Sequence, residues 1–176
     1  GSMGLTRPGW EWRLLMRLEA DVYRAGEYQL EAGTKPKQFL AILSSGQVIQ
    51  YRFTVVEGWT FKQLAAALDA NQTLAHQFDL ADSSGWNAVS ASLGLEHPEG
   101  WFLPETYQFT RGDSDRDILV RAYAAMSQAL DEAWNARDEE LPINSPYELL
   151  ILASIIERET SLDVERPLVA GVFARR

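Results

Sequence analysis

The chain has 176 residues, of which 46% are hydrophobic and 11% aromatic, enough to bury the core of one domain or two small ones. Its net charge of -9 argues against a nucleic-acid partner, because few basic groups are left to neutralise phosphates. The absence of cysteine and the presence of only two histidines exclude disulfides, cysteine nucleophiles and histidine-rich metal sites. We therefore expect no metal and no cofactor, and any catalysis must use carboxylates, hydroxyls or amines.

The first fifty residues are predicted to form two helices and a short strand. Apolar spacing predicts a helix from Trp10 to Arg24 that is closed by Gly26. A short strand is predicted from Tyr28 to Leu30. Thr34 is the predicted N-cap of a second helix, which ends at Gly46.

The next segment alternates between strand and helix signals. Gln47 to Val56 is rich in β-branched and aromatic residues and predicts a strand. Thr60 is a predicted N-cap for a helix over Phe61 to Leu68. Asp82 to Gly85 has the composition of a polar turn, and Ala88 to Leu93 is predicted to be a short helix.

The second half begins with a linker from Gly94 to Gly100, in which the His97-Pro98 pair disfavours helix. The aromatic segment from Trp101 to Phe109 contains a proline, which cannot donate to a ladder, so we expect a loop or an edge strand. Asp117 to Ala136 keeps its apolar residues on one stripe and predicts a long helix.

The last predicted helix has a strong start signal, with Ser145 as N-cap, Pro146 at the first helical position and Glu148 at the third. Its residues are apolar nearly all round, so we expect it to be buried at the centre of its domain. These residues are Leu149, Leu150, Ile151, Leu152, Ala153, Ile155 and Ile156.

Glu157 follows this apolar run directly, and its position suggests acid-base chemistry. Burial and the negative end of the helix dipole both favour the protonated carboxyl group, as a general acid requires. Glu159 lies about 160° away around the helix and cannot form a facing pair with it. The alternative is an ion pair between Glu157 and a nearby arginine such as Arg158 or Arg175.

Three separated segments resemble those of the endolytic murein transglycosylases, the YceG-like family. Residues 153–160, with the sequence ASIIERET, resemble the catalytic helix of that family. Residues 99–107, EGWFLPETY, are similar to its aromatic segment, and residues 55–60, VVEGWT, are similar to its LysM-like turn. The resemblance runs in order from about Gly26 to Arg176.

The resemblance implies roles for three residues, and helix spacing adds a fourth. Glu157 matches the catalytic glutamate of the family, which acts as both acid and base. Glu105 and Tyr107 belong to the segment expected to border the glycan cleft. Helix spacing places the small Ser154 beside the Glu157 carboxylate, where we expect it to contact substrate. A purely structural role for Tyr107 is an equal alternative to sugar contact.

The resemblance also implies an α+β fold and a domain organisation. Residues 1–3 have the sequence of a cloning remnant, and residues 4–93 are expected to form a module with a LysM-like part at about 50–71. Residues 94–176 are expected to be the first portion of a catalytic domain that continues past Arg176. The whole protein is expected to be held in the bacterial inner membrane by one helix outside this chain, with its body in the periplasm.

The implied function is lytic cleavage of peptidoglycan within its glycan strands, with 1,6-anhydro-MurNAc ends as products. Glycan strands would be the substrate, and peptidoglycan synthases are expected partners. One alternative is a non-catalytic glycan-binding module in which Trp59 and Trp101 stack on sugars. The other is a hydrolase in which Glu105 is the second carboxylate.

Overall fold

The computed structural model describes residues 26–160 and 162–174. The predicted helix from Trp10 to Arg24 lies outside the described residues. The chain divides into two compact units between Ile49 and Gln50. Within the described ranges, no helix has the length and apolar content needed to span a membrane.

The first unit contains helix α2, Pro36–Ser45. Its N-cap is Lys35, with Pro36 at the first helical position, so the prediction of Thr34 as the cap is wrong by one residue. The Thr34 hydroxyl instead donates to the Glu31 carbonyl, at 2.7 Å. Gly46 ends the helix in the left-handed conformation, as predicted.

The strand predicted from Tyr28 to Leu30 is absent, and these residues have no regular structure. Glu27 and Ile49 share one backbone hydrogen bond of 2.7 Å, but a single bond does not make a ladder.

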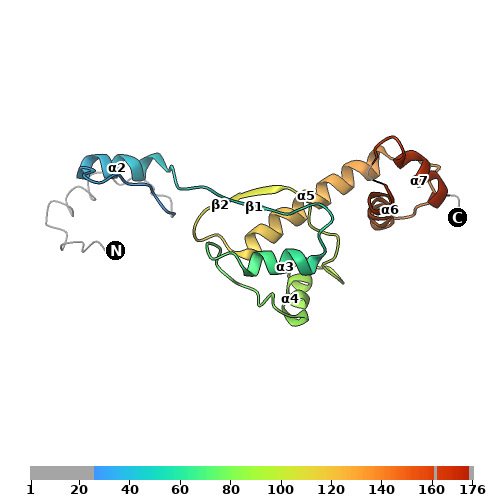
Figure 1. The fold of residues 1–176 in the computed structure, drawn as a ribbon, viewed down its shortest axis with the longest axis horizontal. Helices are drawn as coiled ribbons and strands as arrows, with labels where there is room; N and C mark the ends of the chain where they lie inside the picture. Colours follow the sequence, from blue (N-terminus) through green and yellow to red (C-terminus); the bar gives the residue numbers. More distant parts are fainter. Residues whose placement is uncertain (1–25, 161, 175–176) are drawn as a thin grey trace. The chain divides into compact units, whose positions relative to one another are not determined.

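The second unit opens with the order β1, α3, α4 and β2 (Figure 1). Strand β1, Tyr51–Thr54, pairs antiparallel with β2, Thr106–Phe109, so that Tyr51 faces Phe109 and Thr54 faces Thr106. The sheet therefore joins segments on both sides of the division expected between residues 93 and 94. Helices together with this small sheet confirm an α+β fold.

Both helices between the strands begin at a capping side chain. Thr60 caps α3, Phe61–Asp69, by accepting from the Gln63 amide, as predicted. Helix α4, Ser83–Leu93, begins earlier than predicted because Asp82 caps it by accepting from two backbone amides. The expected polar turn at Asp82–Gly85 is therefore the first turn of α4. Gly85 lies against the Asp79 carbonyl, where any side chain would collide.

The core of the second unit lies between the sheet, α3, α4 and the first half of helix α5, Asp115–Ala136. Phe61 makes an edge contact with Trp86 and a tilted contact with Phe102. Such aromatic pairs add to the free energy gained by burying apolar surface. The buried members include Phe53, Phe61, Leu64, Leu68, Val89, Phe102, Tyr107, Phe109, Ile118 and Leu119.

Asp115 ties the start of α5 to the loop that follows α3. Its side chain is fully buried, and its carboxylate accepts hydrogen bonds from the backbone amides of Gln77 and Phe78, at 3.0 and 3.3 Å. It also accepts from the amide of Arg116 at 2.6 Å. Because a buried charge is tolerated only when it is hydrogen-bonded, this contact fixes the loop and the helix together.

Two further helices complete the second unit. Helix α6, Pro146–Glu159, contacts α5 and α7, and α7 spans Arg166–Ala174. Ser145 caps α6 by accepting from the Glu148 amide, as predicted, while the Glu148 carboxylate accepts from the Asn144 amide.

Replacing Asp115 with alanine leaves the amides of Gln77 and Phe78 without their acceptor. We expect Asp115→Ala to lower the free energy of unfolding by about 3 kcal/mol, because hydrogen bonds to a charged group are each worth about 1.5–3 kcal/mol. Urea unfolding followed by circular dichroism measures the loss. Asp131→Ala, at an exposed position of the same helix, should change stability by less than about 0.5 kcal/mol. Equal stability of the two variants would contradict this role for Asp115.

Candidate active site

Helix α6 carries the predicted catalytic residue, but it is not the buried central helix that its composition predicts. Along Pro146–Glu159, all of it described, no side chain is buried. Tyr147 and Ile151 are 47% and 42% exposed. An apolar helix is buried only when neighbours surround it, and α6 packs mainly against α5 and α7, with Tyr147 stacked on Trp101. The prediction of a central α6 is therefore wrong for this part of the chain.

Glu157 lies in the last turn of α6 and is paired with an arginine. Its side chain is 52% exposed, and its Oε2 accepts from Nη2 of Arg166 at 2.9 Å. Nη1 of Arg166 also lies 3.2 Å from Oδ1 of Asp163. The alternative that Glu157 pairs with an arginine is thus confirmed, but the partner is Arg166 rather than Arg158. Arg175, the other candidate, lies outside the described residues.

Glu157 and Arg166 border a shallow open hollow of about 350 Å³ between α6 and α7. The rest of its lining is small or apolar: Ala153, Ile156, Pro167 and Ala170. Among the described residues, Glu157 is the single carboxylate of this lining. A half-exposed carboxylate beside a hollow can exchange a proton with a bound molecule.

The described residues contain no group of three or more histidine, aspartate or glutamate side chains placed to hold a metal ion. The hollow beside Glu157 presents one acid and one guanidinium. The chemistry available there is proton transfer and hydrogen bonding to a polar substrate.

The profile of the YceG-like family matches residues 2–176, almost the whole chain. The chain belongs to the YceG-like family. Three lining residues of the hollow, Ala153, Ile156 and Glu157, lie in the segment that carries the family-like sequence ASIIERET.

Two relatives of this YceG-like chain are named endolytic murein transglycosylases. The protein of Bacillus subtilis (strain 168) is 25% identical over an alignment of 173 positions, which covers 89% of this chain and 48% of that protein. The protein of Streptococcus pneumoniae serotype 2 (strain D39) is 24% identical over an alignment of 182 positions, which covers 87% of this chain and 32% of that protein. The YceG-like chain thus spans about half or less of the length of these relatives.

A solved structure has the same fold. The 2.6 Å crystal structure of a yceG-like protein from Listeria monocytogenes matches with a TM-score of 0.53 and 21% sequence identity. The match covers 95% of this YceG-like chain and 60% of that chain. At this identity the likeness supports the fold alone.

The other predicted site residues of the YceG-like chain are not lining residues of the hollow. Ser154 is exposed on α6, and its hydroxyl donates to the Ile151 carbonyl at 2.7 Å. Glu105 precedes β2 with an exposed side chain, and its backbone carbonyl accepts from the Val55 amide. Their predicted contacts with substrate stay predictions.

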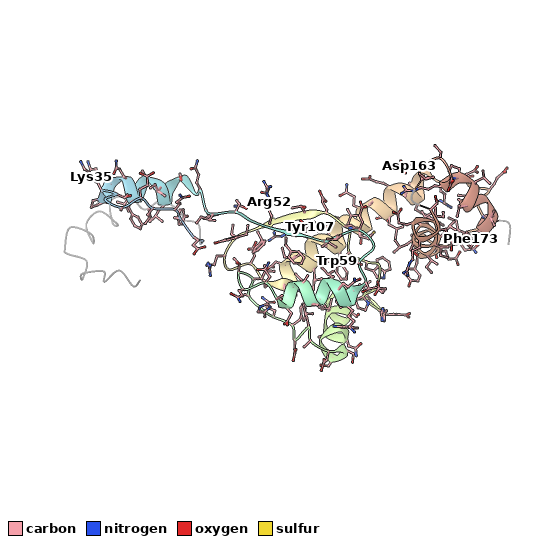
Figure 2. The ribbon with its side chains drawn as sticks, in the orientation of Figure 1. Lys35, Arg52, Trp59, Tyr107, Asp163 and Phe173 are labelled. Carbon is pink, nitrogen blue, oxygen red and sulfur yellow. The ribbon has the colours of Figure 1, made fainter. Side chains whose placement is uncertain are left out.

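Tyr107 lies on β2 within the core of the second unit, whereas Asp163 lies in the turn before α7 (Figure 2). The Tyr107 side chain is 8% exposed, and the Tyr107 hydroxyl donates to the Leu103 carbonyl at 2.7 Å. Burial first, and the charge of Glu105 second, raise the pKa of Tyr107 to about 12. These contacts favour the structural alternative for this residue.

Arg166 and Asp163 were not predicted from the sequence as site residues. Both follow Glu157 within nine positions, in a short connection between two helices. Such a connection brings the end of one helix beside the start of the next. An arginine at the start of the helix that follows Glu157 is the signal from which this ion pair could have been predicted.

The structural role of Tyr107 can be tested with Tyr107→Phe. We expect a loss of about 1 kcal/mol in unfolding free energy near neutral pH, because one hydrogen bond is removed. The folded-state pKa lies above the ordinary value of about 10, so the neutral phenol stabilises the fold below pH 10. That contribution is lost as pH rises toward 12, and the gap between the two proteins narrows.

Urea unfolding at several pH values measures this gap, and Tyr123→Phe on α5 is the matched control. Weaker binding of Tyr107→Phe to peptidoglycan, with stability unchanged, would instead support contact between Tyr107 and sugar.

Proposed function

We propose that this chain carries the acid-base helix of an endolytic murein transglycosylase, with Glu157 as the catalytic residue. The observation that carries the proposal is the position of Glu157, the single carboxylate among the described residues that line the hollow between α6 and α7. The names of the relatives from Bacillus subtilis and Streptococcus pneumoniae support the same activity. The substrate is the glycan strand of peptidoglycan.

In the proposed reaction, Glu157 first donates its proton to the oxygen that links MurNAc to GlcNAc. The bond from that oxygen to the muramic C1 breaks, and an oxocarbenium-like state develops at C1. The Glu157 carboxylate then accepts the proton of the muramic C6 hydroxyl, whose oxygen bonds to C1 and closes the 1,6-anhydro ring. One proton leaves Glu157 and one returns, and no water is consumed.

The lining of the hollow favours this one-carboxylate reaction over hydrolysis with Glu105 as a second acid. A two-carboxylate glycosidase places both groups across one glycosidic bond, about 5–9.5 Å apart. Glu105 lies before β2 and is not a lining residue of the hollow, which is formed by α6 and α7.

The strand and helix at residues 50–71 are the LysM-like part in this proposal. Strand β1 followed by the capped helix α3 supports it, since the family-like sequence VVEGWT lies at their junction. Trp59 in that sequence is partly exposed and only partly buried against the core, so part of its side chain is accessible to a sugar.

We further propose that the body of the whole protein works in the periplasm, anchored in the inner membrane. This follows from the substrate, because peptidoglycan lies outside the cytoplasm. Peptidoglycan synthases, which make the strands that such an enzyme would cut, are the proposed partners.

The activity is tested with Glu157→Gln in the full natural protein that contains these residues. The amide has nearly the shape of the acid but cannot deliver a proton, so we expect glycan cleavage to fall by at least about a hundredfold. Mass spectrometry of purified glycan strands measures internal fragments with 1,6-anhydro-MurNAc ends. Glu159→Gln, on another face of the same helix, should retain activity.

The products also separate the alternatives. Fragments with reducing ends that carry oxygen from labelled water would show that the protein is a hydrolase and not a lyase. Strand binding without any fragments from the unaltered protein would indicate a binding module.

Trp59→Ala tests the LysM-like part in the Glu157→Gln background, where strands bind without being cut. Loss of one stacking contact should weaken co-sedimentation with insoluble peptidoglycan about two- to tenfold. Trp134→Ala, which removes a partly exposed tryptophan of α5, is the control. Equal binding by both variants would leave Trp59 with a packing role alone.

A further inference from the structure

Arg166 reaches two carboxylates from the first position of α7. Its Nη2 donates to Oε2 of Glu157 at 2.9 Å, and its Nη1 lies 3.2 Å from Oδ1 of Asp163. The side chain of Asp163 is 87% exposed, whereas Glu157 borders the hollow. The guanidinium plane is therefore held at two points, and Glu157 is the partner that faces the site.

The turn between α6 and α7 holds Arg166 opposite Glu157. Thr160, which ends α6, is buried, and its hydroxyl donates to Oε2 of Glu165 at 2.9 Å. The same hydroxyl accepts from the Leu162 amide at 3.1 Å. The Glu165 amide donates back to the Leu162 carbonyl at 2.9 Å. Arg166 therefore follows a turn whose ends are bonded to each other.

The side chain of Arg166 is 42% exposed, but the position of its Nε atom is unfavourable for a contact that serves stability alone. Its Nε is buried, and no hydrogen-bond acceptor for it is found among the described residues. A buried donor without an acceptor costs free energy, whereas an ion pair with a half-exposed carboxylate contributes little. A functional role for the pair accounts for this arrangement better than stabilisation does.

The two oxygens of Glu157 have different surroundings. Oε2 accepts from Arg166, while the described residues supply no hydrogen bond to Oε1. When Glu157 is protonated on Oε1, its Oε2 is the carbonyl oxygen and still accepts from Nη2. When Glu157 is ionised, the same contact remains as a charge-assisted bond. One geometry thus serves both halves of an acid-base cycle.

We propose that Arg166 is a positioning residue that holds Oε2 of Glu157, so that Oε1 alone gives and takes the proton. The inference rests on the proposed function and deepens it by assigning each oxygen a task. Oε1 loses its proton to the glycosidic oxygen and regains one from the C6 hydroxyl, while Arg166 keeps its own protons throughout. Lysine offers one nitrogen in place of two, and cannot hold Glu157 and Asp163 with the same planar fork.

The test uses the full natural protein with Arg166→Ala and Arg166→Lys. Arg158→Ala is the matched control, because Arg158 is exposed, is adjacent to Glu157 and has a side chain of the same type. We expect kcat for glycan cleavage to fall about 10- to 100-fold in both Arg166 variants, since a carboxylate misplaced by about 1 Å costs about 100-fold. The half-saturating glycan concentration should change little, because binding is not the step affected.

Chemical rescue distinguishes positioning from folding. Guanidinium at concentrations far below those that denature should restore part of kcat in Arg166→Ala, and none in Glu157→Gln. Rates of both Arg166 variants equal to that of Arg158→Ala would overturn the proposal. A rise in half-saturating concentration with kcat unchanged would also overturn it, since Arg166 would then bind the substrate.

Two further results keep the proposal separate from the function on which it rests. If Arg166→Ala loses its cooperative thermal transition, the Lys variant decides: a folded Lys variant with full kcat overturns the positioning role, and one with reduced kcat supports it. If the unaltered protein releases no fragments, the proposed function fails first and the inference with it.

Discussion

The position of helix α5 is the constraint on which the rest of the second unit depends, because α5 contacts both the sheet and α6. Its start is fixed by the buried carboxylate of Asp115, which accepts amides from the loop after α3. The Ser114 hydroxyl and backbone hold the pKa of Asp117 below its ordinary value in the same first turn. Beyond this start, α5 contacts α6, which contains Glu157. The position of the candidate site therefore depends on a buried contact at the opposite end of α5.

Local chemistry predicts most of the helices and few of the longer-range contacts. Thr60, Ser145 and Gly46 end or begin helices as expected, because a hydroxyl acceptor or a residue in the left-handed conformation acts on its own neighbours. The cap at Asp82 is also a local contact, but the polar residues around it favoured a turn, so the start of α4 was predicted too late. The prediction of a strand at Tyr28–Leu30 was wrong because a strand needs a partner strand, which a local sequence pattern does not supply.

The exposure of α6 also depends on contacts that are distant in the sequence. An all-apolar helix predicts a central position only if enough chain surrounds it. The described residues place α5 and α7 against α6 and leave Ile151 and Tyr147 exposed. The resemblance to a family predicted Glu157 as the catalytic residue, and the alternative of an ion pair with an arginine was correct in kind. The identity of the partner depended on how the chain turns between Thr160 and Arg166, which is a tertiary property.

The half-exposed state of Glu157 determines how its proposed chemistry must work. The sequence suggested that burial would keep the carboxyl group protonated, but water reaches about half of this side chain and Arg166 donates to it. In the free hollow, Oε2 of Glu157 is held by Arg166, and the described residues supply no hydrogen bond to Oε1. For the first step, the water around Oε1 must give way to the glycan itself, because a bound sugar excludes solvent and strengthens electrostatic interactions in the site. In the proposed reaction, the contact between Arg166 and Oε2 stays the same while the solvent around Oε1 changes.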